Sequence, residues 1–344
     1  MPRGCAAGFI RGRYKVLPDD FVVDEVPAYE PSGHGEHLWL WIEKRSVATL
    51  PVLEDLGRAL GVDPRAVGVA GLKDARSVSR QWVSVQGVAE DAVRALAGRS
   101  WRVLRATRHD NKLKMGHLRG NRFAITLRGT EPGDLEIARQ NLAELVRVGV
   151  PNYFGEQRFG KRGANLDTGL RILDGGARAM ARKMPRRVFG LVVAAVQSEV
   201  FNRVVMKRLA TLGTLLPGDL AILHKNHACF PVEDPAREQP RADAFELSPS
   251  GPMHGPKMPQ PGGEPRAIED AALRDLDLDP DRFRDLPFGV GAGERRPLRV
   301  PVHDVGAEEV EAGALQLRFS LPRGCFATSV LRELLTETIW FAED

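Results

Sequence analysis

Cysteine is scarce in this sequence, and its three residues, Cys5, Cys229 and Cys325, lie far apart in the chain. No CxxC pair occurs, which excludes the usual zinc and redox motifs and argues against a disulfide framework. The N-terminus lacks the apolar segment and cleavage site of a signal peptide, and no apolar run approaches the ~20 residues that span a bilayer. We therefore expect a cytoplasmic protein without membrane association or a bound metal.

The remaining composition is that of an ordinary globular protein. The chain has 344 residues, of which 43% are hydrophobic and 27% charged. This length suits one large or two medium domains, each able to bury a sizeable core. The formal net charge of +4 is modest, so the distribution of charge says more about partners than its total.

Basic residues concentrate in two stretches. The first, from Arg99 to Arg122, has eight basic residues and one acidic residue, Asp110, and the second runs from Arg158 to Arg187. Residues 264–311 hold most of a compensating acidic surplus. One such stretch is typical of a solvated surface, but two suggest a groove that binds a polyanion. Candidate contacts to a nucleic-acid backbone are Arg105, Arg108, Lys112, Arg158, Lys161 and Arg162.

Hydrophobic periodicity predicts an α+β protein with a mainly antiparallel sheet. Alternation typical of strands occurs at 21–26, 38–42, 82–85, 123–127 and 315–321. Helical spacing occurs at 49–60, with Thr49 as the expected N-cap and Gly61 as the stop, and again at 134–148 and 328–340.

Residues 149 to about 299 differ from the rest. A helical stretch near 192–212 is followed by loops rich in Pro and Gly from Pro231 to Pro265. We therefore expect a second domain that interrupts the first, so that 1–148 and 300–344 form one discontinuous domain and 149–299 an insertion.

Several short motifs fail when their context is considered. "GEQRFGKR" at Gly155 resembles a phosphate-binding loop, but Arg162 stands where a Mg²⁺-binding hydroxyl is required. "GVGAGE" at Gly289 has no strand before it and no helix after it. His34, Glu36 and His37 have no further ligand nearby, and no GxSxG elbow occurs. None of these motifs therefore predicts a cofactor or metal site.

The segment "AGLKDARSVSRQW", 70–82, places Asp74 in a turn between two apolar stretches. An aspartate in such a turn usually caps backbone N–H groups, and Gly71 supplies conformational freedom. Spacing alone therefore leaves the choice between a structural and a catalytic Asp74 open.

Six segments taken together resemble the TruD family of tRNA pseudouridine synthases. They are "PDDFVVDEVP" (18–27), "GEHLWLWIEKR" (35–45), "AGLKDARSVSRQW" (70–82), "LRGNRFAITLR" (118–128), "VPNYFGEQRFG" (150–160) and "LPRGCFATSVLREL" (321–334). The resemblance spans nearly the whole chain and is weak at 213–297. It implies a pseudouridine synthase catalytic domain, with a mixed, mainly antiparallel sheet flanked by helices, and the family's inserted α+β domain.

The resemblance also implies a substrate and a set of site residues. The substrate is uridine 13 in the D arm of tRNA, with tRNA(Glu) the usual bacterial target. Asp74 matches the catalytic aspartate, and the matching positions around the uridine pocket are Lys15, Phe21, Asn121, Phe123 and Phe326. Ala75 and Arg76 depart from the family's usual residues after the aspartate, which leaves the role of Arg76 open.

Isomerising uridine transfers no group to another molecule and involves no net redox change, so we expect no cofactor. We also expect a monomer with no obligate protein partner. A non-catalytic RNA-binding or RNA-folding protein remains the alternative, because it would have the same basic stretches without depending on Asp74. An RNA methyltransferase is disfavoured, since no convincing glycine-rich cofactor loop follows a first strand.

Overall fold

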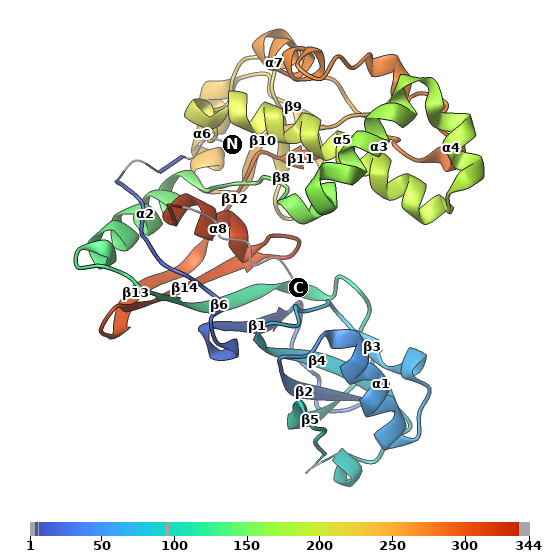
Figure 1. Ribbon diagram of the computed structural model, residues 1–344, viewed down its shortest axis with the longest axis vertical. Coiled ribbons are helices and arrows are strands. Elements are labelled where there is room, and N and C mark those ends of the chain that lie inside the picture. Colours follow the sequence, from blue (N-terminus) through green and yellow to red (C-terminus); the bar gives the residue numbers. More distant parts are fainter. Residues whose placement is uncertain (1–3, 6, 94–95, 337–344) are drawn as a thin grey trace. The chain divides into compact units, whose positions relative to one another are not determined.

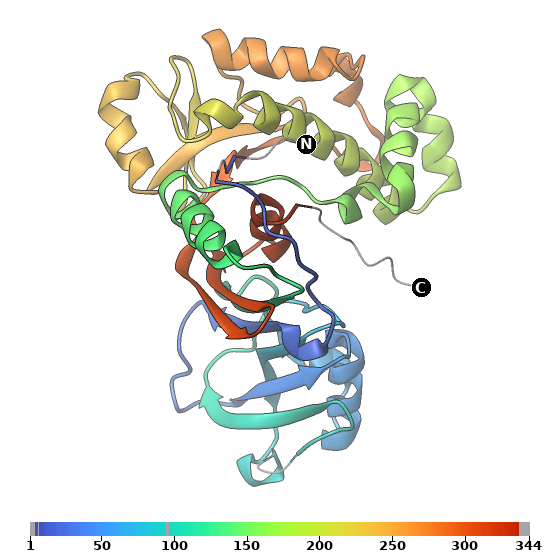
Figure 2. The ribbon, with the colours of Figure 1, turned by 60° about the vertical axis from the view of Figure 1, so that its left-hand side comes forward.

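The computed structural model describes residues 4–5, 7–93 and 96–336. The chain divides into two compact units, whose course can be followed in Figures 1 and 2. The first, the sheet unit, comprises Ala7–Ala143, Val302–Ala327 and Leu334–Asp344. The second, the helical unit, comprises Met1–Ala6, Glu144–Pro301 and Thr328–Glu333. Both units are therefore discontinuous in sequence.

An eight-stranded mixed sheet forms the core of the sheet unit. Its strands are β1 (Phe21–Pro27), β2 (His37–Arg45), β3 (Gly68–Val69), β4 (Val78–Gln86), β5 (Trp101–His109), β6 (Leu118–Arg128), β13 (His303–Glu311) and β14 (Ala314–Pro322). The order is β13-β14-β6-β1-β4-β2-β5, and β3 pairs with β4. β1 and β4 run parallel, whereas the other neighbours among these strands are antiparallel. The predicted α+β class with a mainly antiparallel sheet is confirmed.

The five stretches predicted as strands all lie within strands of this sheet, because alternation assigns one set of side chains to a buried face. In β2, Leu38, Leu40 and Ile42 are fully buried. They belong to one apolar core with side chains of α1 (Thr49–Leu60) and β4. That half of the sheet is therefore covered by α1, as Figure 1 shows.

The start of α1 differs from the prediction. Ala48, not Thr49, occupies the N-cap position, and Gly61 ends the helix with φ = 67°. Thr49 is the first helical residue, and its hydroxyl contacts Lys73 and Gln81 instead of capping its own helix. The predicted N-cap hydrogen bond of Thr49 does not form, and its hydroxyl bonds instead to residues that are distant in the sequence.

Two more helices are divided between the two units. α2 (Asp134–Val148) has the predicted bounds. α8 (Ala327–Leu334) is shorter than the predicted 328–340, since Leu335 forms a β-bridge with Ile10 and the Thr336 N–H donates to the Ile10 carbonyl. Residues 337–340 lie outside the described residues.

Five helices lie wholly within the helical unit among its described residues. They are α3 (Ala164–Arg171), α4 (Ala177–Lys183), α5 (Arg186–Lys207), α6 (Pro235–Asp243) and α7 (Gly263–Arg274). A four-stranded sheet has the order β11-β10-β8-β9, with β8 (Leu220–Leu223), β9 (Cys229–Pro231), β10 (Leu247–Met253) and β11 (Glu294–Pro297). β7 (Val150–Pro151) pairs separately with β12 (Arg299–Val300). α5 packs against α3, α7 and β10 and is the central helix of the unit.

α5 is also the one described helix that is long and apolar enough to cross a membrane. Two thirds of its most apolar window, 67%, is buried inside the protein. Phe189, Val196 and Phe201 are among its fully buried side chains. Its apolar character therefore matches that of the core helix of a folded unit.

The loops predicted from Pro231 to Pro265 are wrong in part, since α6 and β10 lie there. Asp234 caps α6 by accepting hydrogen bonds from the N–H groups of Ala236 and Arg237, and Pro235 fits the first turn. β10, "LSPSGPM", is buried along its whole length. It pairs with β8 over Leu247–Pro249 and with β11 over Ser250–Met253. Pro249 and Pro252 are therefore each paired with a strand on one side only, which suits a residue that has no N–H to donate.

Candidate active site

The turn that leads from β3 into β4 presents Asp74 to solvent. The side chain of Asp74 is 65% exposed, and its Oδ2 accepts a hydrogen bond of 3.1 Å from Lys15 Nζ. Lys15 itself is 20% exposed and has φ = 58°, which is uncommon for a residue with a side chain. The chain therefore brings two predicted site residues, 59 positions apart, into an ion pair.

Phe21 lies directly beside this ion pair. The Lys15 ammonium is 4.3 Å from the centroid of the Phe21 ring, a distance at which a cation and a ring attract each other. Tyr14 packs against Phe21 with ring centroids 6.3 Å apart. Burial and, to a smaller extent, the Asp74 carboxylate raise the pKa of the Tyr14 phenol. Lys15 is therefore flanked by an aromatic ring on one side and the carboxylate on the other.

Phe123 extends the aromatic wall along the sheet. It lies on β6 opposite Val23, with its ring 6.2 Å from that of Phe21 and 5.3 Å from that of Phe319. Phe21 and Phe123 are only 4% and 7% exposed. These two rings thus form a dry wall whose faces are mostly covered by protein.

Asn121 lies two residues before Phe123 on β6, opposite Glu25 of β1. Its Oδ1 is buried and has no hydrogen-bond partner among the described residues. An unsatisfied buried acceptor costs roughly 1–3 kcal/mol. A hydrogen-bond donor on a bound ligand would remove that cost.

Phe326 differs from the other two phenylalanines. It lies in the connection between β14 and α8 and is 58% exposed. Within the described part of the chain, Lys15 stacks on the Phe21 ring and pairs with Asp74, and Phe326 takes no part in either interaction. The structure therefore brings Lys15, Phe21 and Asp74 into direct contact. Phe123 and Asn121 lie on β6, the strand next to β1, and Phe326 is an exposed ring outside these contacts.

The backbone of the Asp74 turn is held by buried and partly buried polar groups that were not predicted as site residues. Lys44 Nζ donates to the Asp74 carbonyl at 2.6 Å, and the Ser77 hydroxyl donates to the same oxygen at 2.9 Å. The Lys73 N–H donates to Thr49 Oγ1 at 2.8 Å, and Gln81 Nε2 donates to the Gly71 carbonyl at 3.1 Å. The turn is thus fixed from β2, α1 and β4.

A buried ion pair holds the turn to β1 as well. Lys73 Nζ lies 2.5 Å from Glu25 Oε2, and the two side chains are 6% and 1% exposed. The other oxygen of Glu25 accepts from the Trp82 N–H at 3.3 Å. Burial raises the pKa of Glu25, and the Lys73 ammonium opposes that rise. The sequence could have indicated Lys44 and Glu25, since each is a charged residue at an inward-facing position of an apolar strand.

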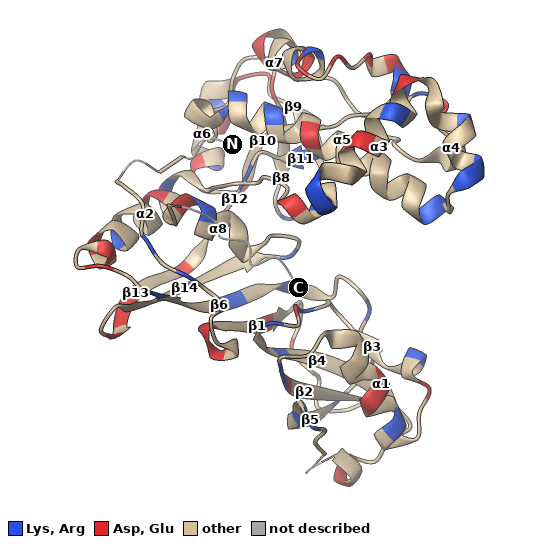
Figure 3. Cartoon of the chain, in the orientation of Figure 1, with Lys and Arg blue, Asp and Glu red and all other residues tan. Residues whose placement is uncertain are grey.

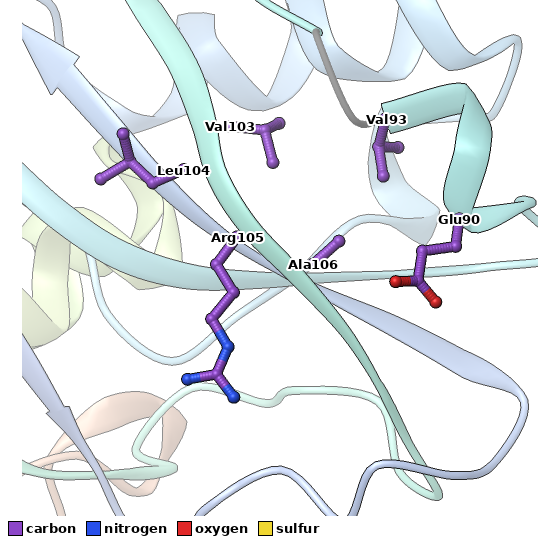
Figure 4. Close-up of a pocket in the computed structure, with 6 residues that line it drawn as sticks. All are labelled: Glu90, Val93, Val103, Leu104, Arg105 and Ala106. Carbon is purple, nitrogen blue, oxygen red and sulfur yellow. The ribbon is translucent and has the colours of Figure 1, made fainter.

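The three basic candidates of the sheet unit differ in their surroundings. Arg105 is exposed on β5 and lines a pocket of about 140 Å³ with Glu90 (Figure 4). Arg108 donates to the Val88 carbonyl at 3.2 Å, and Lys112 to the Arg65 carbonyl at 3.2 Å. None of the predicted uridine-site residues lines this pocket, so it is separate from the Asp74 turn.

The candidates of the helical unit also divide into two kinds. Arg158 is partly buried, donates to the Ser198 hydroxyl at 3.0 Å and lies 5.2 Å from the Phe154 ring centroid. Burial lowers its pKa. Lys161 and Arg162 are exposed. Further exposed cations, visible in blue on α4 and at the start of α5 in Figure 3, are Arg178, Arg182, Lys183, Arg186 and Arg187.

The described residues contain no group of three His, Cys, Asp or Glu side chains arranged to hold a metal ion. What they contain is a lysine-paired carboxylate on a fixed turn, beside an aromatic wall in a mixed sheet. Together with the exposed basic side chains of both units, this arrangement fits a nucleic-acid-modifying enzyme.

Comparison with known proteins gives the family. The family model described as tRNA pseudouridine synthase D (TruD) matches residues 6–184 and 176–334. A tRNA pseudouridine synthase D from Syntrophotalea carbinolica is 39% identical, covering 95% of this chain and 96% of that protein. One from Thermus thermophilus is 43% identical, covering 95% and 89%.

A solved structure agrees in fold. The crystal structure described as tRNA pseudouridine synthase D from Methanosarcina mazei superposes with a TM-score of 0.83 and 22% sequence identity, covering 98% of this chain and 96% of that one. The chain therefore belongs to the tRNA pseudouridine synthase D family and is a tRNA-modifying isomerase.

Proposed function

We propose that the protein converts uridine 13 of tRNA(Glu) to pseudouridine, with Asp74 as the catalytic carboxylate. The observation that carries the proposal is the exposed Asp74 side chain, which pairs with Lys15 at 3.1 Å. The buried Lys44 fixes the backbone of the same turn. The position 13 and the tRNA(Glu) target rest on the family resemblance of the motifs around Asp74.

The reaction needs one group that can act as nucleophile or base. The N1–C1′ bond of the uridine breaks, the base turns, and a C5–C1′ bond forms. The hydrogen of C5 leaves as a proton, and N1 gains a proton, so that atoms and electrons balance without another reactant. A carboxylate can add to the nucleoside or abstract a sugar proton, and Asp74 would take either role.

The target uridine has to leave its stack in the folded tRNA. Extruding a base costs a few kcal/mol, and stacking on an aromatic side chain returns roughly 1–3 kcal/mol. Phe326, with its exposed ring, would supply that stacking. Asn121 Oδ1 would accept a hydrogen bond from the N3–H of the base, the donor that this buried oxygen lacks.

Lys15, Phe21 and Phe123 would set the environment of the carboxylate. The Lys15 ammonium would hold the Asp74 carboxylate in place through their ion pair. The Phe21 and Phe123 rings would exclude water from one side of the base. Exclusion of water strengthens the electrostatic interactions in the site.

We also propose that residues 149–299 form an inserted domain that binds the tRNA, with 1–148 and 300–344 as the catalytic domain. The antiparallel pairing of Val150 with Val300 supports the insertion, because it sets its two ends side by side. The exposed cations Lys161 and Arg162, together with those of α4, support the RNA contact, with Arg158 as a less exposed candidate. The protein would act as a monomer.

The experiment that tests the catalytic role is the substitution Asp74→Asn. The amide keeps the shape of the side chain but removes its charge and basicity, so single-turnover pseudouridine formation should fall by at least ~10⁴-fold. The readout is release of tritium from C5-labelled uridine in unmodified tRNA(Glu), alongside a titration of tRNA binding, which should hardly change.

Asp110→Asn is the matched control, since Asp110 is an exposed aspartate of the same unit and its substitution should leave activity normal. Near-normal product from Asp74→Asn would remove Asp74 from the chemistry. Binding of tRNA without any product from the unaltered protein would instead favour a non-catalytic RNA-binding protein.

A further inference from the structure

Lys44 is a fully buried lysine in the middle of the sheet unit. It follows Leu38, Leu40 and Ile42 along the inward face of β2, and all four side chains are 0% exposed. A lysine in such a series loses the hydration of its ammonium group, which is costly unless the protein supplies partners. Its position therefore calls for a specific role.

The partners of Lys44 are two backbone carbonyls. Its Nζ donates to the Asp74 carbonyl at 2.6 Å and to the Val47 carbonyl, in the segment before α1, at 2.8 Å. The Asp74 oxygen also accepts from Ser77, whose hydroxyl is 2.7 Å from that of Ser79. One buried ammonium thus ties the residue with the exposed carboxylate to the start of α1.

We propose that Lys44 is a positioning residue for the isomerisation, acting through the backbone of Asp74. Lys15 bonds to the carboxylate of Asp74, whereas the buried Lys44 bonds to the backbone carbonyl of the same residue. The inference rests on the proposed catalytic role of Asp74. Displacement of a reacting group by about 1 Å can cost roughly 100-fold in rate, so a fixed turn has a direct kinetic value.

The electrostatics of Lys44 give the proposal a second readout. Burial lowers the pKa of Lys44 to about 8, opposed by the Asp74 carboxylate and reinforced by the Lys73 ammonium. These two side chains of the turn are the charged groups that act on it; Thr49, Ser77 and Ser79 nearby do not titrate in this range. Below about pH 8 an ammonium donates to the Asp74 carbonyl, and above it a neutral, weaker donor remains.

The test is Lys44→Met, which keeps a long side chain and removes the charge and the donor. Single-turnover pseudouridine formation on unmodified tRNA should fall roughly 10- to 100-fold, while the Kd for tRNA changes less than about twofold. The unaltered protein should lose rate as the pH rises through about 8, and Lys44→Met should lack that fall. Lys44→Gln serves as a second buried, uncharged variant in case methionine prevents folding.

Leu40→Ala is the control for lost stability, because Leu40 is equally buried on the same face of β2 and its side chain has no donor for the Asp74 carbonyl. The proposal is overturned if Lys44→Met and Leu40→Ala lose rate in the same proportion to their loss of Tm. It is also overturned if the unaltered protein keeps a constant rate from about pH 7 to about pH 9. A fully active Lys44→Met beside an inactive Asp74→Asn refutes this inference alone, whereas an active Asp74→Asn refutes the proposed function.

Discussion

The three phenylalanines assigned to the uridine pocket do not offer the same surface. Phe326 is 58% exposed, whereas Phe21 and Phe123 are 4% and 7% exposed. A base can stack only on a ring face that it can reach, and an exposed aromatic ring has an unfavourable contact with water that stacking removes. Phe326 is therefore the ring from which we expect a direct stacking contribution.

We expect Phe326→Ala to reduce pseudouridine formation by roughly 5- to 150-fold, which corresponds to the loss of one base–aromatic stack of about 1–3 kcal/mol. Activity should stay measurable, in contrast to Asp74→Asn. Phe288→Ala is the control, because Phe288 is also exposed, at 42%, and belongs to the helical unit. An equal loss of activity in both variants would mean that the effect is not specific to the pocket.

The candidate site could be inferred from the sequence only in part. The family resemblance named Lys15 and Asp74, which the structure places 3.1 Å apart. Lys44, Thr49 and Glu25 were not predicted as site residues, because their role depends on contacts across 24 to 48 positions of the chain. A contact of that range leaves no periodic pattern, although an inward-facing charge in an apolar strand does indicate that a partner must exist.

β5 carries three arginines, Arg102, Arg105 and Arg108, and it is an edge strand of the sheet. It pairs with β2 on one side, and the register shifts between Trp41 and Ile42. Arg102 is neutralised by Glu43 at 2.7 Å, whereas Arg105 is exposed. Charged residues on an edge strand discourage pairing with other strands and leave cations for a polyanion.

We expect the triple reversal of Arg105, Arg108 and Lys112 to glutamate to weaken tRNA binding by tenfold or more, about 1.4 kcal/mol. The slope of log Kd against log salt should also decrease, by roughly 0.9 for each phosphate that the variant no longer neutralises. Binding titrations at several salt concentrations measure both quantities.

The matched control reverses Arg237, Arg274 and Arg282, three exposed arginines outside the basic stretches, and thus changes the net charge equally. Equal weakening by both triple variants would show a general effect of net charge, and unchanged affinity of the first would refute the basic surface. Thermal melting of each variant is needed, because Arg108 and Lys112 also bond to backbone carbonyls.

Periodicity predicted some elements of this protein well and missed others for physical reasons. The helices at 49–60 and 134–148 have one buried side, and β1 and β14 alternate in burial, which produces a regular pattern. β5 lacks a regular pattern because arginines occupy much of its surface, and β10 lacks one because all seven of its residues are buried. The prolines of β10 suggested a loop, but an exchange of partner strands accommodates them.

At the level of the whole chain, the proposed insertion can be removed. We expect replacement of 150–298 by a short Gly/Ser linker to leave a folded sheet unit with at least tenfold weaker tRNA binding. The Tm should fall, since Thr328–Glu333 of α8 clusters with the helical unit and Arg332 would no longer have the Tyr153 ring to pack on. Circular dichroism and a binding titration provide the measurements. Complete unfolding would disprove the boundaries, and normal tRNA modification would disprove the role.

The pairing of β7 with β12 has a consequence for the order in which the chain folds. β6 and β14 are neighbours in the sheet, with Arg128 opposite Ala314, so a very long loop must close before they can meet. Once Val150 has paired with Val300, the free chain between the two strands is reduced to roughly a fifth. Since each doubling of loop length costs about 0.6 kcal/mol, early closure of the helical unit lowers the entropic barrier to completing the sheet by roughly 1–1.5 kcal/mol.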